Sequence, residues 1–416
     1  MTSKTAPIAQ HRQAIFSRRE TRLSMLCAWA WAVVFTAGGC ATNSPVDSAA
    51  DKPASVASQN QSPGGHDRIL EFTPASASPG TDAWINPPSR AENAPGSPSA
   101  TLNLTQVTFA QEGADFDPAI SRDGSRIVFA STQHRSTADL YTKAVGGRTI
   151  TQLTNDPAED GTPEISPDGT RVAFASNRNG NWDIFVMPIT GGKPVQITSD
   201  LSDELHPSWS SDGNSLVFCR MGPTSGRWEM WVADATRAGG ETFIGHGLFP
   251  RWCPAPRTGS DGADRIVFQL GRERGQRSFA IWTIDYRDGQ ASNPTLIASS
   301  SAAALINPAW SPDGSHIVYA SVPLIDERRP AGTSLPSAEL WLASVTAEAT
   351  VRLTSSDLRA IRPVWGPANR LYFVSDRNAT ENIWSIDLAP SLASIQPANG
   401  SSAAKTADAA DADRAP

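Results

Sequence analysis

Side chains that most often carry enzyme chemistry are scarce in this sequence. Only four of the 416 residues are cysteines and six are histidines. No two of the histidines between residues 101 and 388 have the spacing of metal ligands. The sequence also lacks a Gly-x-Ser-x-Gly hydrolase motif and a glycine-rich phosphate loop after a strand. We therefore expect a protein that is not an enzyme, with no catalytic residues and no cofactor.

An excess of positive charge is missing as well. Lys and Arg number 35 against 42 Asp and Glu, and the net charge is −7. A nucleic-acid-binding protein normally presents a basic face, so we expect no nucleic-acid partner. Long helical patterns are absent, whereas 31 glycines and 32 prolines favour short strands joined by tight turns. The sequence thus predicts an all-β fold.

The first 39 residues have the features of a secretory signal peptide. A basic start that includes Arg18, Arg19 and Arg22 precedes an uncharged, largely apolar stretch over residues 23–39. Small residues stand directly before Cys40, which resembles a bacterial lipobox whose cysteine is acylated. Ala37 departs from that pattern, and an uncleaved membrane anchor or ordinary secretion are the alternatives. Each of these readings places the rest of the chain outside the cytoplasm, either in the periplasm or anchored to a membrane.

Two segments have the composition of disordered chain. Residues 40–100 and 389–416 are dominated by small and polar residues, which cannot bury enough apolar surface to offset their ordering entropy. We expect a flexible tether after Cys40, one folded domain over residues 101–388, and a disordered tail. Cys219 and Cys253 lie in the domain, and they either form a disulfide or serve as small buried hydrophobes, which we favour.

The domain contains a repeat whose landmark is a proline followed two residues later by a bulky side chain. An apolar strand comes next, and then a third strand that carries an aromatic residue after an aliphatic one. Ten tryptophans lie in residues 101–388, and eight of them occupy these two bulky positions. The landmark prolines are Pro118, Pro163, Pro207, Pro250, Pro308 and Pro363.

Six units of four strands are typical of a six-bladed β-propeller with antiparallel blades. The sixth unit ends after its third strand, and residues 102–109 resemble the fourth strand of the first unit at residues 149–154. We therefore expect the N-terminal strand to close the ring and the protein to be a monomer. An acidic residue recurs in the third strand at Asp139, Asp183, Glu229 and Glu339. Because it recurs, we interpret it as structural.

Pro308-Ala-Trp-Ser-Pro-Asp-Gly314, with the strands that follow it, resembles the WD40-like repeats of TolB-type propellers. The resemblance covers residues 101–388, with a longer loop at 254–264 and no Asp-Gly turn in the sixth repeat. It implies a TolB-like propeller of the cell envelope. TolB proteins have an α/β domain before the propeller that engages the Tol-Pal machinery, whereas residues 40–100 take that place here.

Charged residues near the landmark prolines make a candidate binding site. Loops that lead into the first strands of a propeller gather on one face around its channel. We expect Asp115, Asp117, Asp160 and Glu204 to make one half of this mouth acidic, and Arg251 and Arg362 to make the other half basic. We expect that replacing Asp115, Asp160 and Glu204 by Ala weakens the binding of a partner at this mouth without unfolding the domain. In the alternative reading these carboxylates cap their own loop backbones; a Ca²⁺ ion in the channel is permitted but not required.

The sequence favours a lipid-anchored, extracytoplasmic scaffold. Its expected partner is an envelope protein, a peptide or a cell-wall component, bound at the channel face. The alternative is a carbohydrate-active or peptidase-related enzyme that binds substrate in the channel.

Overall fold

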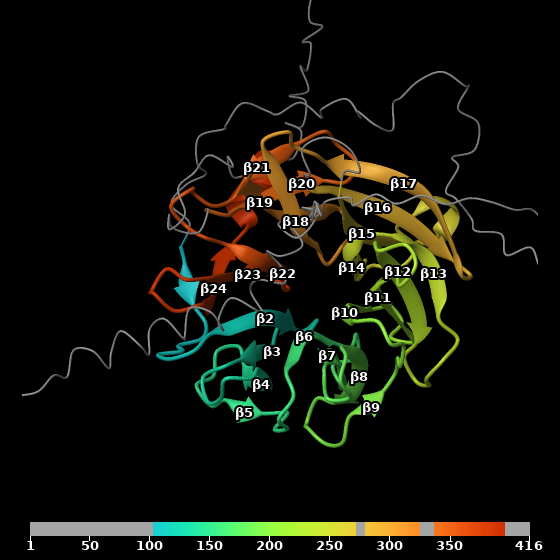
Figure 1. Ribbon diagram of the computed structural model, residues 1–416. Helices are drawn as coiled ribbons and strands as arrows, with labels where there is room; N and C mark the ends of the chain where they lie inside the picture. The colour runs from blue at the N-terminus through green and yellow to red at the C-terminus, as the bar shows by residue number, and fades with distance from the viewer. Residues whose placement is uncertain (1–102, 272–278, 325–336, 396–416) are drawn as a thin grey trace, which may run out of the picture. The chain divides into compact units, whose positions relative to one another are not determined.

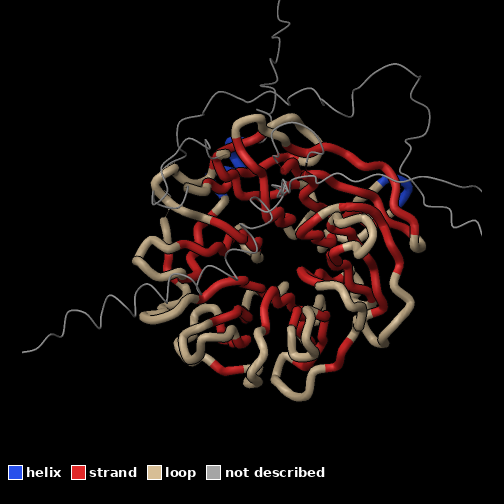
Figure 2. Tube along the Cα trace, viewed as in Figure 1, coloured by secondary structure: helices blue, strands red, loops and turns tan. Residues whose placement is uncertain are grey.

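Six antiparallel sheets of four strands are arranged around a common axis (Figure 1). The computed structural model describes residues 103–271, 279–324 and 337–395. Strands and their connecting turns account for nearly all of this part of the chain (Figure 2). The predicted all-β, six-bladed propeller is therefore confirmed.

The strands of a blade follow one another from the axis outward, so each blade is a simple meander (Figure 1). Blade 1 contains β2 (Asp115–Ile120), β3 (Arg126–Ser131), β4 (Asp139–Ala144) and β5 (Thr151–Gln152). Blade 2 contains β6 (Asp160–Ile165), β7 (Arg171–Ser176), β8 (Asp183–Pro188) and β9 (Val195–Gln196). Blade 3 contains β10 (Glu204–Trp209), β11 (Ser215–Met221), β12 (Trp228–Asp234) and β13 (Thr242–His246).

The other three blades have the same order, with one exception at the end of the chain. Blade 4 contains β14 (Leu248–Trp252), β15 (Asp264–Gly271), β16 (Phe279–Arg287) and β17 (Gln290–Ala298), with the short helix η1 (Ser260–Gly262) in its first loop. Blade 5 contains β18 (Ala303–Trp310), β19 (His316–Pro323), β20 (Glu339–Ser344) and β21 (Thr350–Arg352). Blade 6 contains β22 (Ile361–Trp365), β23 (Arg370–Ser375), β24 (Asn382–Asp387) and, as its outer strand, β1 (Thr105–Gln106).

The N-terminal strand closes the ring, as the sequence predicted. Thr105 pairs with Ser385 across β1 and β24. The Asn382 side chain accepts a hydrogen bond from the Ala110 amide at 2.7 Å. From blade 1, the buried Lys143 ammonium donates to the Val107 carbonyl at 2.6 Å. Both ends of the described domain are thereby joined in one blade.

Large rings fill the spaces within and between blades. Phe129, Phe174, Phe218 and Phe373 occupy equivalent second-strand positions and are fully buried. The inner-strand tryptophans are buried too, and two of them donate to the preceding blade: the Trp209 indole to the Glu164 carbonyl at 3.1 Å, and the Trp310 indole to the Arg251 carbonyl at 2.9 Å. Removing these rings from water stabilises the stacking of neighbouring blades.

The turns between first and second strands have the predicted geometry. Gly124, Gly169, Gly213 and Gly314 have φ between 71° and 75°, where a side chain would be strained. In the turn that ends at Gly169, the Asp168 carboxylate accepts from the Ser166 hydroxyl at 2.5 Å and from the Thr170 amide at 3.0 Å. These residues form the turn by local hydrogen bonding.

Two predictions about the domain are settled by the described residues. Helix α2 (Ala389–Ile395) follows β24 and buries Ser391 and Ile395, so the expected boundary at residue 388 is wrong for these seven residues. Tertiary packing orders a segment whose composition alone suggested disorder. Cys219 and Cys253 are free and buried, which agrees with the favoured interpretation.

Predictions for the leader, Cys40, the tether and the tail beyond residue 395 lie outside the described residues. Of the helices within the described ranges, none has the length and hydropathy that a membrane crossing requires.

Candidate functional site

Each inner strand contains a β-bulge immediately before its landmark proline. The pairing with the second strand shifts register there, as between Phe116 and Ala119 in blade 1. The residue before the proline has φ between 47° and 57° in all six blades. This left-handed region is uncommon for residues other than glycine, and each such residue costs on the order of 1–3 kcal/mol. The six residues are Asp117, Thr162, His206, Phe249, Asn307 and Arg362.

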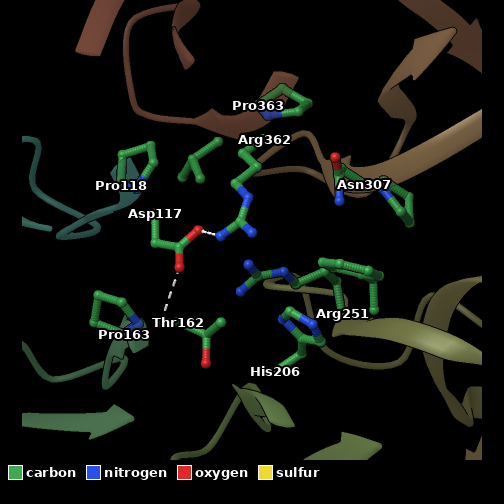
Figure 3. Close-up of a pocket in the computed structure, with 12 residues that line it drawn as sticks. Asp117, Pro118, Thr162, Pro163, His206, Arg251, Asn307, Arg362 and Pro363 are labelled. Atoms are coloured by element: carbon green, nitrogen blue, oxygen red, sulfur yellow. Dashed lines mark hydrogen bonds and ion pairs between the residues drawn. The ribbon is translucent and has the colours of Figure 1, made fainter. Parts of the chain in front are cut away.

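These six residues, which we call the axial ring, line a pocket on the propeller axis (Figure 3). The space between the lining atoms is about 380 Å³, including the part that opens to solvent. Arg251 adds a second basic side chain, and Val364 and four of the landmark prolines contribute apolar walls. A concave pocket with apolar walls and a few convergent polar groups is the usual form of a binding site.

Two ion pairs join blades across or around the pocket. Arg362 of blade 6 pairs with Asp117 of blade 1, whose carboxylate also accepts from the Thr162 amide at 3.1 Å. Arg251 of blade 4 reaches Glu164 of blade 2, with 2.5 Å between nitrogen and oxygen. Burial raises the pKa of Glu164, and Arg251 opposes this shift. Each guanidinium thus has one carboxylate partner at the pocket wall.

His206 is held as a neutral, stacked ring. Its centroid lies 3.7 Å from that of Phe249, with 29° between the planes. Burial lowers the pKa of His206 to about 3, and the nearby charge of Arg251 acts in the same direction. At neutral pH the imidazole is therefore uncharged and only weakly basic, which makes it a poor general base.

Asn307 contributes an unsatisfied amide to the pocket. The residue is 5% exposed, and its backbone N–H is anchored by the Gln269 side-chain oxygen at 2.8 Å. Neither Oδ1 nor Nδ2 of its side chain has a hydrogen-bond partner within the described part of the chain. Leaving buried polar atoms unpaired costs about 1–3 kcal/mol each, so such groups normally meet a ligand or water.

One end of the channel is spanned by an arginine. Arg122 lies in the turn between β2 and β3, and its guanidinium donates to the carbonyls of Ser211 at 3.2 Å and Pro254 at 3.3 Å. Ser211 follows β10 of blade 3 and Pro254 follows β14 of blade 4, which stands opposite blade 1 in a six-membered ring. The side chain therefore crosses the axis on the face that carries the first-to-second-strand turns, which we call the turn face. The opposite face, the loop face, carries the loops that lead into the inner strands.

The structure brings three of the six predicted site residues together and separates the other three. Asp117, Arg251 and Arg362 line the axial pocket. The side chains of Asp115, Asp160 and Glu204 are instead fully buried at the starts of their inner strands.

The three buried acids bind side chains near the ends of the second strands. Asp115 accepts from the Gln133 amide at 2.7 Å, and Asp160 pairs with Arg178 at 2.9 Å. Glu204 accepts from Arg220 Nε at 2.7 Å. The expected exposure of these three acids is therefore wrong. Because they are buried and paired, we now expect that replacing all three lowers stability. The alternative that they cap their own loop backbones does not match these partners either.

Sequence reasoning missed most of the axial ring. Thr162, His206, Phe249 and Asn307 stand in the position before the landmark proline, which differs in every repeat. Framework positions repeat along the chain, whereas this position varies beside an invariant proline. That contrast within one sequence was the signal that could have found the pocket.

The pocket does not fit a metal cation. Among the residues that the structure describes, no group of three or more His, Cys, Asp or Glu side chains could hold one. Asp117 is already paired with Arg362, and the Arg251 guanidinium faces the same space. A Ca²⁺ ion would meet two positive charges there, so the permitted ion in the channel is not supported by these residues.

The recurring third-strand acids take part in hydrogen bonds that repeat between blades. Gln152 donates to Asp139 at 3.1 Å, and Gln196 donates to Asp183 at 3.0 Å. In blade 6 the same position is Asn382, which binds the closing segment. These contacts fit the structural interpretation.

Replacing Asp183 by Asn should flatten the pH dependence of stability. Burial raises the pKa of Asp183 to about 6, and Asp200 and Asp203 contribute to the shift. The folded state therefore holds this proton more tightly than the unfolded state, and wild-type stability falls as the pH rises from about 4 to 6. Asp183→Asn should remove about 1–2 kcal/mol of that fall, and its amide oxygen can keep one of the two side-chain hydrogen bonds that Asp183 accepts. Urea unfolding at pH 4, 5, 6 and 7.5 measures the slope, and parallel profiles for the two proteins would contradict this assignment.

Comparison with known proteins agrees with this architecture. Residues 100–248 match the family model described as the TolB beta propeller domain. A protein from Agrobacterium tumefaciens that is assigned as TolB is 23% identical, and its structure superposes with a TM-score of 0.49. The match covers 62% of this chain and 90% of that one. TolB from Acinetobacter baumannii is 17% identical with a TM-score of 0.44, and the match covers 64% of each chain. Oligogalacturonate lyase from Vibrio parahaemolyticus is 14% identical with a TM-score of 0.46, and the match covers 72% of this chain and 100% of that one.

No curated protein matches the sequence. Residues 100–248 are thus similar to the TolB beta propeller domain, and the fold is that of a six-bladed β-propeller. All six blades line its axial pocket.

Proposed function

We propose that this protein is a non-catalytic binding protein of the cell envelope, which receives a segment of a protein or peptide partner in the axial pocket. The observation that carries the proposal is the axial ring. Six inner strands each hold a residue in a strained conformation that lines one pocket, and the buried Asn307 amide there is unpaired. The strained bulge recurs in every blade and so belongs to the framework; what singles out this position is that six unlike side chains meet in one pocket.

Access to the pocket favours a segment that comes from the loop face. Arg122 spans the channel on the turn face, so a ligand from that side would have to displace it. On the loop face, Leu201 is 96% exposed in the loop that leads into β10. An exposed apolar side chain on this face offers a partner additional contact area.

The proposed location rests on the leader. The basic and apolar pattern of residues 1–39 supports export, and the small residues before Cys40 support a lipid anchor. A propeller held at a membrane surface by a tether would meet envelope partners without entering the bilayer.

An enzyme that acts on a carbohydrate or peptide is the competing proposal. It would need a group that moves protons in the pocket. His206 is disfavoured for that role by its low pKa, and Asp117 and Glu164 are each held by an arginine. These features favour binding over catalysis.

Site-specific photo-crosslinking in the native envelope tests the proposed function. A photoreactive residue at position 201 should form discrete adducts with a partner, since this position borders the loop face. The matched control is position 288, whose side chain is 94% exposed in the β16–β17 turn on the turn face. Adducts of equal yield from both positions, or none from position 201, would contradict binding at the loop face.

A further inference from the structure

Three nitrogen donors on consecutive blades converge on one side of the axial pocket. Arg251 comes from blade 4, Asn307 from blade 5 and Arg362 from blade 6. Figure 3 shows all three side chains directed into the same space. We call these residues the donor arc.

The donor arc can bind a further carboxylate. A guanidinium has five N–H donors in a planar fork, and among the described residues the Arg251 guanidinium forms an ion pair with one oxygen of Glu164, which uses only part of this fork.

Asn307 adds a requirement that a simple anion does not meet. Its unpaired side chain offers one acceptor oxygen and an NH₂ donor, and both atoms are buried. A peptide unit presents the complementary pair, an N–H donor and a C=O acceptor. A ligand that satisfies both Asn307 and the guanidinium of Arg251 carries an amide next to a carboxylate.

The closed turn face limits how a chain can occupy the pocket. A segment that enters from the loop face cannot pass through while Arg122 bridges blades 1, 3 and 4. It must end in the pocket or turn back. A chain end supplies a carboxylate directly after its last amide, whereas an Asp side chain would have to be presented by a chain that reverses inside the pocket. Pro118, Pro163, Pro308 and Pro363 form apolar walls around that end.

We propose that the axial pocket binds the free C-terminal carboxylate of a partner peptide chain, with Arg251 and Arg362 on the carboxylate and Asn307 on the last peptide unit. The inference rests on the proposed function and specifies which part of the partner is bound. Capture of a terminal carboxylate by clustered donors is a physically established mode of recognition.

The test uses a pool of acetylated pentapeptides with randomised sequences, present in equal amounts as free acids and as C-terminal carboxamides. The full-length protein is incubated with the pool, and retained peptides are counted by mass spectrometry. A charge-assisted hydrogen bond contributes about 1.5–3 kcal/mol, so free acids should be enriched by about 10-fold or more. Equal retention of acids and amides, or retention of neither, would overturn the proposal.

Variants connect the preference to the donor arc. Arg251→Gln should abolish the preference for acids, while Arg287→Gln, on the exposed edge of the same blade, should retain it. Arg251→Gln also leaves Glu164 without its partner, so its thermal unfolding is compared with wild type. Asn307→Asp keeps the size and the left-handed backbone preference and places a negative charge against the ligand. Among the described residues the Asn307 side chain has no hydrogen-bond partner to lose. A preference that survives in folded Asn307→Asp protein would contradict the assigned geometry.

A competition arm separates a peptide end from an acidic sugar. Oligogalacturonate also carries carboxylates, but it has no peptide unit for Asn307. If it displaces the retained peptides and binds more tightly than they do, the pocket recognises a sugar acid and the proposal fails. Adducts from position 201 together with no preference for free acids would overturn the chain-end inference alone, whereas loss of both would overturn the proposed function as well.

Discussion

Replacing Arg220 by Met should lower the free energy of unfolding by about 3–5 kcal/mol, since it breaks a buried charge network. Arg220 is 5% exposed and pairs with Glu204, which is fully buried, and with Glu241. Its guanidinium also lies 4.5 Å from the centre of the Trp231 ring. Methionine fills similar volume but leaves both carboxylates without their cation.

The loss should be larger at pH 8 than at pH 5. Burial raises the pKa of Glu204 to about 7 even with Arg220 beside it, and removing the cation raises it further. The folded variant then holds a proton that the unfolded chain releases above about pH 4.5, so its stability falls as pH rises through and beyond 7. Urea unfolding followed by tryptophan fluorescence at both pH values measures the difference.

Two controls separate charge from packing. Arg287→Met alters an exposed arginine and should change stability by less than about 1 kcal/mol. Adding Glu204→Gln to Arg220→Met should recover part of the loss, because it removes the buried carboxylate that the single variant leaves without its cation. A double variant no more stable than the single one would show that the unpaired charge is not the cause.

Deleting residues 103–109 should open the ring and cause self-association. The deletion removes β1 and exposes the edge of β24. It also removes the buried Val107 side chain, the partner carbonyl of Lys143 and the Thr108 hydroxyl that accepts from the Ile383 amide. The lost burial and the unpaired groups together should cost about 3 kcal/mol or more.

Light scattering after gel filtration and urea unfolding test this expectation. An open strand edge is a template for pairing with another chain, so dimers or larger species should appear. Asn382→Ala is the matched variant, because it weakens the attachment of the closing segment without removing β1. It should lower stability by a smaller amount and remain monomeric. A deletion variant that is monomeric and as stable as wild type would show that β1 is not needed for closure.

The repeated landmarks were sufficient to predict the architecture. A proline and a bulky ring at fixed spacing predicted the inner strand, and Trp209 and Trp310 do bind the preceding blade in the structure. The likeness of residues 102–109 to an outer strand predicted how the ring closes, and β1 pairs with β24. Such features depend on local hydrogen bonding and on burial of a periodic apolar face, and both are determined by residues close together in the sequence.

The site was predicted only in part because exposure is not a local property. Asp115, Asp160 and Glu204 begin their inner strands, where a charge suggested an open mouth, but each is buried and paired with a side chain at or just beyond the end of the second strand. Asp117, two residues beyond Asp115, lines the pocket. A bulge of one residue reverses which side chain faces the axis, and the repeat pattern does not show it.

By itself, the sequence determined the number of blades, the order of strands, the turns and the closure. Each of these features follows from a local residue pattern that is repeated along the chain. Only the tertiary structure decided which of the residues that differ between repeats come into contact. Arg251 finds Glu164 two blades away, Asn307 is left unpaired, and Arg122 spans the channel, because closing the ring brings together side chains that are far apart along the chain.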